Sequence, residues 1–291
     1  MTASTLAFIG CGNMGSAILS GLLDSTRSES QSAKITRFIV STKSASSAEK
    51  LRSTYAADST RVDIAPGQNL RAMQEANIVM LACKPFLAEE ILSEEGVAEA
   101  LVGKFVISVM AGKTPEEIMS FIYKNKALPT DTEKPVIVRA MPNVAASIGK
   151  SVTIIEGNPA LSAERAAILS WAFEQIGTVK YVASNLVDAG SIISGASMAL
   201  VSVALDGILD GAVIEGYRRG EALEISAQVL EGMAGLLREG VHPAVLRENI
   251  SSPRGCTIQG LFTLEKKGVR GTFAEAVVNG TKHLRGEKVG G

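Results

Sequence analysis

Three glycines near the start of the chain have the spacing of a dinucleotide-binding turn. Gly10, Gly12 and Gly15 follow a short apolar run and precede a segment with helical periodicity. The first glycine permits a tight turn, the second lets a pyrophosphate approach the backbone, and the third lets the helix pack closely on the strand. The N-terminus of the helix then faces the anion. The same spacing also occurs in plain turns, but its place between a strand and a helix favours a dinucleotide site.

The residues after the second apolar run indicate which dinucleotide binds. In NAD sites an acidic side chain at this point hydrogen-bonds the ribose. Here the chain has Ser41, Thr42 and Lys43 and no carboxylate. A lysine can offset the charge of a 2′-phosphate, and hydroxyl groups can bind its oxygens. We therefore predict NADPH in preference to NADH, the alternative being a solvated polar loop.

Two further segments lie where the fourth and fifth predicted strands end. Ala82-Cys83-Lys84-Pro85 follows the fourth strand, and Ala111 lies just beyond the fifth. Ligands of open α/β sheets bind outside the carboxyl ends of the strands. Pro85 restricts the chain where it leaves the sheet. Lys84 is either close to the cofactor phosphates or nicotinamide, or an ordinary loop lysine.

A polar segment late in the chain, Asn249 to Thr257, joins two predicted helices. It contains hydroxyl groups, a proline and a glycine directly before the second helix. Free N–H groups at such a helix N-terminus can bind a substrate carboxylate. Ordinary capping of the helix by a hydroxyl is the alternative, and the simpler one on local grounds.

These segments need a sheet that brings them to one edge. Apolar runs alternate with helical stretches as far as Val182, which is typical of a parallel sheet covered on both faces. Strands are expected at 5–9, 38–40, 62–64, 78–81, 106–109, 136–138, 152–155 and 179–182, and a polar loop at 25–33. Beyond Val182 strand signals stop, and 186–217, 221–238, 244–249, 256–267 and 272–285 have helical patterns. We predict an α/β fold: a Rossmann-like domain with a mostly parallel sheet, residues 1–182, and an all-helical dimerisation and substrate domain, residues 183–291.

Composition limits the partners and the location. The 291 residues suit two domains, 46% are hydrophobic, and the formal net charge is −1 with scattered basic residues, which argues against nucleic acid. The cysteines Cys11, Cys83 and Cys256 lie far apart without metal-ligand spacing, so no metal site is expected. Unpaired cysteines suit a reducing compartment, and the start of the chain lacks a targeting pattern. We expect a cytoplasmic protein.

One apolar segment, Ala189 to Leu205, has no charged residue and approaches the length of a membrane span. Serines and a glycine dilute its hydrophobicity, and flanking lysines or arginines do not follow it at once. A helix buried between subunits is the interpretation we favour, because an apolar helical domain hides its excess face in a dimer. The prediction is a homo-oligomer, at least a dimer through the helical domain, and no membrane span.

Taken in order, the motifs resemble the pyrroline-5-carboxylate reductase family over nearly the whole chain. The opening Phe8 to Met14, Asn69, Ala82 to Pro85 and Arg139 to Asn143 match elements of that family. Most specific is Glu248 to Thr257, which is similar to the family's Asn-Val-Ser-Ser-Pro-Gly-Gly-x-Thr signature. The first motif is shared by many dehydrogenases, whereas the last is not.

The resemblance implies NADPH-dependent reduction of the C=N bond of a small cyclic imino acid, most simply 1-pyrroline-5-carboxylate to L-proline. Thr257 would act as the catalytic residue by hydrogen-bonding the ring nitrogen, and the substrate carboxylate would be held by Ser252, Gly255 and Cys256. The implied cofactor residues are Gly10, Gly12, Asn13, Met14, Ser41, Thr42, Lys43, Asn69, Ala82, Cys83, Lys84, Pro85, Ala111 and Asn249. In the family these parts come from two interlocked subunits.

The chain departs from the family pattern at three places. Ser194 to Ala199 lacks a glycine and a proline, Ala145 stands where proline is usual, and Arg254 replaces the first glycine of the Pro-Gly-Gly turn. If that turn needs a positive φ, the arginine is strained by roughly 1 kcal/mol or more. Arg254 either binds an acidic substrate group or points to solvent.

Three other functions stay open. Changes in a pocket alter specificity on a fixed scaffold, so the substrate could be a different, substituted cyclic imine in specialised metabolism. A β-hydroxyacid dehydrogenase would need a base near the start of the interdomain helix, yet no lysine, arginine or histidine lies between Lys180 and Arg218. A non-catalytic NADPH-binding protein would have kept only the dinucleotide site.

Overall fold

The computed structural model describes residues 4–28, 34–124, 126–128, 130, 133–159 and 161–288. These residues form two compact units. The first unit includes the chain up to Gly195 together with His283–Lys288, and the second is Ala196–Lys282.

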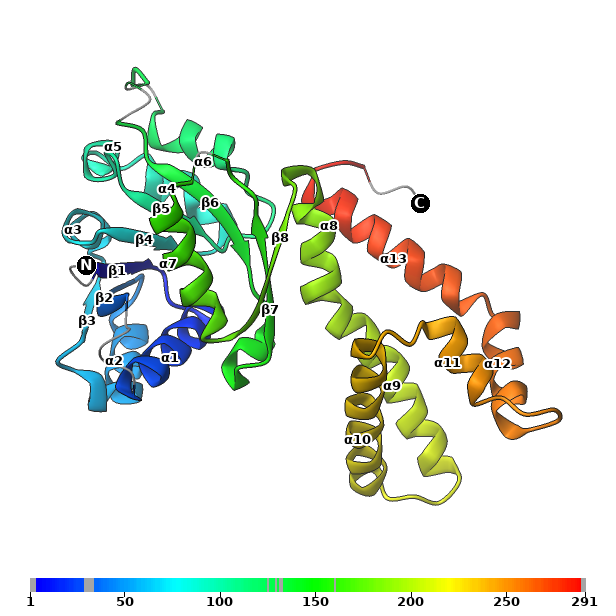
Figure 1. Ribbon diagram of the computed structural model, residues 1–291. Coiled ribbons are helices and arrows are strands. Elements are labelled where there is room, and N and C mark those ends of the chain that lie inside the picture. Colours follow the sequence, from blue (N-terminus) through cyan, green and yellow to red (C-terminus); the bar gives the residue numbers. More distant parts are fainter. Residues whose placement is uncertain are drawn as a thin grey trace. The chain divides into compact units, whose positions relative to one another are not determined.

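The first unit is built on one sheet, whose strands are labelled in Figure 1. They are β1 (Ser4–Ile9), β2 (Ile35–Thr42), β3 (Val62–Pro66), β4 (Ile78–Leu81), β5 (Phe105–Ser108), β6 (Val136–Met141), β7 (Ser151–Glu156) and β8 (Gly177–Val182). Their order in the sheet is β3-β2-β1-β4-β5-β6-β7-β8. All neighbours are parallel except β6 and β7, which are antiparallel. The prediction of a mostly parallel Rossmann-like sheet is confirmed.

Helices cover both faces of this sheet. They are α1 (Asn13–Ser28), α2 (Ala45–Thr54), α3 (Asn69–Glu75), α4 (Ala88–Leu92), α5 (Val97–Ala100), α6 (Pro115–Ile122) and α7 (Ala163–Glu174), with short 3-10 turns η1 (Ala56–Asp58), η2 (Pro85–Leu87), η3 (Val144–Ile148) and η4 (Ser184–Leu186). Along β1, Leu6 and Phe8 join one apolar cluster with residues of α1, α2 and α7, while Ala7 and Ile9 join another with residues of α3 to α6. Alternate residues of a strand point to opposite faces, so a strand buried on both faces is apolar throughout.

Helix α1 differs in two ways from the sequence-based expectation. It continues to Ser28, so the polar run that we expected to be a loop from Ser25 begins inside the helix, and the rest of that run, 29–33, lies outside the described residues. Its tightest packing is at Gly21, where an added Cβ would overlap the side chain of Ile176. At Gly15 an added Cβ would lie 3.4 Å from the Cβ of Ala82, which is near an ordinary contact. The tightest contact of α1 is therefore not the one with a strand that we assigned to Gly15, but the contact of Gly21 with Ile176, directly before β8.

The second unit is all-helical, as predicted. It contains α9 (Ser197–Ile214), α10 (Arg219–Arg238), α11 (Pro243–Asn249), α12 (Cys256–Lys266) and most of α13 (Val269–Leu284). Helices α9 and α10 pack side by side (Figure 1), and Arg219 at the start of α10 forms ion pairs with Asp206 and Asp210 of α9.

This helical unit buries little of its apolar surface. Of its described residues only Leu209, Ala222 and Thr281 are buried. Large apolar side chains that remain exposed include Val203, Ile208, Ile214, Ile225, Val229, Met233, Phe262 and Val278. A soluble monomer rarely exposes so much apolar surface, so this unit has the character of one half of an interface.

The connection from sheet to helices begins where β8 ends, at Val182. Helix α8 (Val187–Ser191) and a π-helical turn, Ile192–Ala196, then lead directly into α9. Within the described part of the chain, the continuous helical segment Ser184–Ile214 is long and apolar enough to cross a membrane. This is weak evidence, because buried helices of soluble proteins meet the same criteria of length and composition. The boundary between the two compact units lies at Gly195, inside the π-turn. The division into a cofactor domain, 1–182, and a dimerisation and substrate domain, 183–291, stays a prediction.

Candidate functional site

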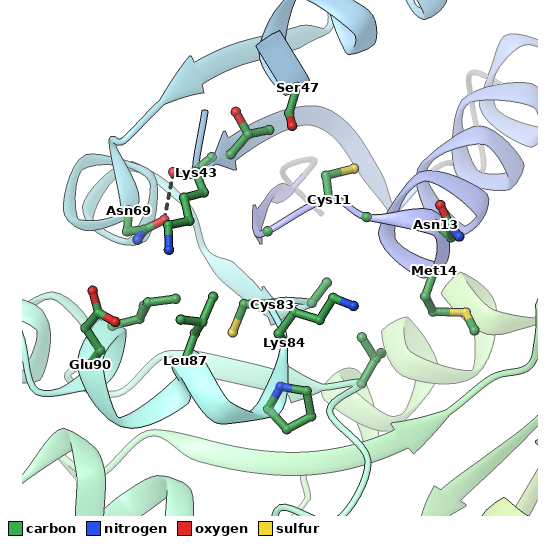
Figure 2. A pocket seen from close by; sticks show the side chains of 18 of the residues that line it. Cys11, Asn13, Met14, Lys43, Ser47, Asn69, Cys83, Lys84, Leu87 and Glu90 are labelled. Atoms are coloured by element: carbon green, nitrogen blue, oxygen red, sulfur yellow. Dashed lines mark hydrogen bonds between the residues drawn. The ribbon is translucent and has the colours of Figure 1, made fainter. Parts of the chain in front are cut away.

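A cleft of about 680 Å³ opens at the carboxyl ends of β1, β2 and β4. The strand order runs outward from β1 to β3 and then returns to β4 on the other side of β1, so β1 and β4 flank the point where the order reverses. This switch point is where open α/β sheets bind their ligands. Figure 2 shows the side chains that line the cleft.

The glycine turn after β1 forms the floor of the cleft. Gly10 has φ 82°, and an added Cβ would lie 2.8 Å from the Cα and N of Cys83, so both conformation and space require glycine. At Gly12, in contrast, an added Cβ would meet nothing within 4 Å. No atom of the chain would clash with a side chain at Gly12, but such a side chain would occupy space in the cleft. This combination fits a turn over which a pyrophosphate lies at the start of α1.

The polar end of the cleft is formed by the ends of β2 and β3 and the start of α3. The hydroxyl of Ser41 donates a 2.7 Å hydrogen bond to Oδ1 of Asn69, and that of Thr42 donates to the backbone oxygen of Ser44 at 3.1 Å. Both hydroxyl residues are buried, whereas Lys43 is exposed. In Figure 2, Lys43 and Asn69 lie at the opposite side of the view from Asn13 and Met14.

Two cysteines line the middle of the cleft. Burial raises the pKa of the Cys11 thiol to about 11, although a hydrogen bond with Ser16 opposes the shift. Burial also raises the pKa of Cys83 to about 11, and its thiol contacts the sulfur of Met110 at 3.5 Å. Both thiols are therefore protonated near neutral pH and act as small apolar wall groups, not as nucleophiles.

Most of the predicted cofactor residues meet in this cleft. Those lining it are Gly10, Gly12, Asn13, Met14, Ser41, Thr42, Lys43, Asn69, Ala82, Cys83, Lys84 and Pro85. Ala111 follows β5 and is not among the lining residues, and Asn249 belongs to the second unit.

Several lining residues were not predicted from the sequence. They are Cys11, Ser47, Gly67, Leu87, Glu90, Ile91 and Val109. Ser47 lies in the same hydroxyl-rich run as Lys43, and Gly67 directly follows a strand end, so both carried a usable signal. Glu90 and Ile91 are on the short helix α4, whose position depends on packing against the sheet and α6, and no local pattern marks them.

The signature segment forms the turn before α12 in the second unit. Gly255 is the N-cap residue of α12, and no side chain caps this end. The N–H of Gly255 donates to the backbone oxygen of Ser252 at 3.0 Å, and an added Cβ on Gly255 would overlap the Ser252 hydroxyl. The alternative of ordinary capping by a hydroxyl is therefore not what this segment forms. Cys256 and Thr257 occupy the first turn of α12, where backbone N–H groups have no helical partner.

Arg254 has φ 62°, the single positive φ among the described residues other than glycine. The position that is glycine in the family turn therefore needs the left-handed conformation, and this chain adopts it with an arginine. The side chain is exposed. The strain that we expected is present.

A parallel sheet with a glycine turn and a polar cleft at its switch point, followed by an apolar helical unit, defines an oxidoreductase of the nicotinamide-dinucleotide class. Residues 5–112 match the family profile "NADP oxidoreductase coenzyme F420-dependent", and residues 184–286 match "Pyrroline-5-carboxylate reductase dimerisation". The chain belongs to the pyrroline-5-carboxylate reductase family.

Relatives with this name match along nearly the full length of the chain. Pyrroline-5-carboxylate reductase of Lophium arboricola is 41% identical over 95% of this chain and 91% of its own, and that of Neurospora crassa is 36% identical over 96% of both. The solved Plasmodium falciparum pyrroline carboxylate reductase with NADP bound has a TM-score of 0.81 and 22% identity, and covers 98% of each chain. The last comparison supports the fold.

Proposed function

We propose that this protein reduces the C=N bond of 1-pyrroline-5-carboxylate to give L-proline, with NADPH as the reductant. The observation that carries the proposal is the 41% identity with a named reductase over 95% of the chain, which spans both the cleft and the signature segment. The match of residues 5–112 to an NADP oxidoreductase family supports NADP(H) as the cofactor.

The residues of the cleft fit this cofactor. Gly12 leaves room for a pyrophosphate beside the start of α1, because an added Cβ there would meet nothing within 4 Å. Lys43, with the hydroxyl of Ser47 in the same cleft, suits a 2′-phosphate, while Thr42, whose hydroxyl donates to the backbone oxygen of Ser44, would line the same end of the cleft. On this ground we propose that NADPH is preferred over NADH. Met14, Ala82, Lys84 and Pro85 would line the other parts of the dinucleotide, with Ala111 and Asn249 contributing from outside the cleft.

NADPH supplies the hydride, and a protonated imine is already an electrophile, so little acid or base chemistry falls to the protein. The task of this chain is to bind and orient its ligands. Cys256, at the uncapped start of α12, would donate its backbone N–H to the substrate carboxylate, together with the Ser252 hydroxyl. Gly255, whose own N–H is bonded to the backbone oxygen of Ser252, would shape the turn around the carboxylate. Thr257 would hydrogen-bond the ring nitrogen from the same turn and hold the imine in place.

The assembly we propose is a homo-oligomer, at least a dimer, formed through the helical unit. Its exposed apolar side chains on α9 and α10 and the match to a dimerisation family support this assembly. The same burial in an interface accounts for the apolar helix Ser184–Ile214 without a membrane. The free thiols of Cys11, Cys83 and Cys256 suit a reducing compartment, and we propose the cytoplasm.

A second candidate keeps the reaction but changes the imine. Arg254 retains a strained left-handed conformation beside the proposed carboxylate site, and such strain tends to persist where function needs it. A substrate with an additional acidic group would gain from this cation.

The test is a steady-state assay of NADPH and NADH oxidation with 1-pyrroline-5-carboxylate, 1-pyrroline-2-carboxylate and six-membered cyclic imino acids. We expect the highest kcat/KM with 1-pyrroline-5-carboxylate and NADPH. Thr257→Ala should lower kcat/KM, and the ratio of the two kcat/KM values should correspond to a loss of roughly 1 to 3 kcal/mol of transition-state stabilisation. Thr54→Ala, a matched change at an exposed threonine of α2 whose hydroxyl donates to the backbone oxygen four residues earlier, should leave it unchanged. NADPH binding without turnover of any imine would instead indicate a non-catalytic protein.

A further inference from the structure

The matched segment Arg139 to Asn143 is not part of the cofactor cleft. Arg139 lies within β6, and Asn143, two residues after the end of the strand, is the N-cap residue of η3. Both side chains are buried and both make polar contacts with the chain that leads out of the first unit. The contacts themselves lie wholly within the first unit.

Arg139 links three elements. Its guanidinium forms a two-point ion pair with Glu156 of β7, at 2.8 and 3.2 Å. It also donates to the backbone oxygen of Ser184 at 3.2 Å and approaches Asp188 of α8 at 3.4 Å. Burial would raise the pKa of Glu156, but the hydrogen bonds from Arg139 and Ser184 outweigh this effect and hold it below its ordinary value. Glu156 thus stays ionised near neutral pH, and Arg139, held by this carboxylate, reaches Asp188 in the first turn of α8.

Asn143 holds the same helix six residues farther along. Its Nδ2 donates a 2.8 Å hydrogen bond to the backbone oxygen of Ser194, inside the π-helical turn. A π-turn interrupts the regular α-helical hydrogen-bond ladder and is found frequently at functional sites. The Oδ1 of Asn143 meanwhile accepts from the N–H of Ala145, at the start of η3. One amide therefore fixes both its own turn and the last residues of the first unit.

The chain returns to the first unit beside the same place. Arg285, just beyond α13, donates to the backbone oxygen of Asn185 at 3.0 Å and lies 3.8 Å from Asp188. The chain passes between the units at Gly195 and again at Lys282. Asp188 is thus the meeting point of contacts that restrain both passages, with Arg139 on one side and Arg285 on the other.

We propose that Arg139, Asn143, Asp188 and Arg285 form a clamp that positions the imine-binding helices for hydride transfer, without contacting either ligand. This inference rests on the proposed function, in which the cofactor is held by the first unit and the substrate by the second. Contacts near Asp188 restrain the chain both where it leaves the first unit and where it returns to it. Without these contacts, the two connections would be free linkers and the position of the substrate turn would vary. Misplacement of reacting groups by about 1 Å costs about two orders of magnitude in rate.

The test compares Asn143→Asp with the native protein. The aspartate keeps the oxygen that accepts from Ala145 but, when ionised, has no donor for the oxygen of Ser194. We expect kcat/KM for 1-pyrroline-5-carboxylate to fall about tenfold or more, while the dissociation constant for NADPH, from fluorescence titration, stays within about twofold. Asn77→Asp makes the same chemical change at an exposed acceptor to the N–H of Thr5 and should alter neither quantity.

Arg285→Gln provides a second variant, because Arg285 is partly exposed and its loss leaves the buried Arg139 and Glu156 pair intact. It should also lower kcat/KM for the imine by several-fold without weakening NADPH binding. Full imine turnover in both variants, or a parallel loss of NADPH affinity, would overturn the clamp. An inactive native protein would instead refute the proposed function, so the two failures are distinct.

Discussion

The hydroxyl of Ser41 donates to the side-chain oxygen of Asn69 at 2.7 Å, which joins the end of β2 to the start of α3 at the polar end of the cleft. The bond uses the hydrogen of Ser41, so this hydroxyl is an acceptor toward any further partner. A phosphate, which accepts hydrogen bonds, therefore needs its donors from neighbouring groups. Lys43 is the cation at this end of the cleft.

Lys43→Ala should accordingly weaken NADPH selectively. We expect KM for NADPH to rise about tenfold and KM for NADH to change by less than about twofold, because only NADPH carries the 2′-phosphate. Lys50→Ala, on the exposed surface of α2, is the control for a general loss of positive charge. Equal changes for the two cofactors would assign Lys43 to the solvated-loop alternative.

The glycines of the turn should separate folding from binding. Gly10→Ala places a Cβ 2.8 Å from the backbone of Cys83 at φ 82°, and should destabilise the protein by about 2 kcal/mol or more. Gly12→Ala meets no atom of the chain, so the unfolding temperature should be unchanged while KM for NADPH rises at least about tenfold. Gly15→Ala should be close to neutral in stability, since its Cβ would be at 3.4 Å from Ala82. Thermal unfolding without cofactor and cofactor titration together measure these effects. Unaltered NADPH binding in Gly12→Ala would argue against a pyrophosphate at this turn.

The contrast between Gly15 and Gly21 shows how far the sequence could be interpreted. A strand, a turn and a helix are local patterns, and Gly10 and Gly12 could be assigned because their roles depend on adjacent backbone. The glycine that packs against Ile176 could not be identified, because that contact joins residues far apart in the chain. The antiparallel direction of β7 was hidden for a related reason: a buried strand is apolar in either direction.

The site follows the same division. Residues at strand ends, such as Ser41 and Lys84, were predictable because parallel strands bring their carboxyl ends to one edge. Glu90 lines the same cleft from a short helix, and only tertiary packing brings it there. The motif at Arg139 was recognisable by resemblance alone, since its partners Glu156 and Asp188 become neighbours only in the folded chain.

Acid should destabilise the first unit through Glu156. The pKa of Glu156 is below its ordinary value of 4.5 in the folded protein, so its stabilising contribution is complete above that value and is lost as pH falls through the lower folded pKa. Glu156→Gln should therefore cost about 3 kcal/mol at pH 7 and progressively less below pH 4.5. Urea unfolding at several pH values and fixed protein concentration measures the difference. Glu164→Gln, exposed on α7, should show no such trend, and a cost for Glu156→Gln that is independent of pH would contradict the assignment.

Charged substitutions on the exposed apolar surface of α9 and α10 should weaken the association of subunits. Val203 on α9 and Val229 on α10 are 72% and 63% exposed in the isolated chain, and burial of an aspartate in an apolar interface is strongly unfavourable. Val203→Asp and Val229→Asp should each weaken association at least about tenfold, as measured by sedimentation or light scattering across protein concentrations. Leu128→Asp changes a residue that is 62% exposed in the first unit and should leave the assembly intact. If both variants remain associated, the interface must lie elsewhere.

Arg254 makes the sharpest prediction about the substrate turn, because folding and specificity can be measured separately there. Its φ of 62° is unfavourable for any side chain, so Arg254→Gly should stabilise the protein by about 1 kcal/mol, partly offset by the greater freedom of glycine in the unfolded chain. Arg247→Gly, inside α11, should have the opposite sign and cost about 1 kcal/mol. If the guanidinium binds an additional acidic group, Arg254→Gly will raise KM for such an imine and not for 1-pyrroline-5-carboxylate. If Arg254→Gly leaves KM unchanged for both imines, the arginine side chain points to solvent and the backbone strain has no role in substrate choice.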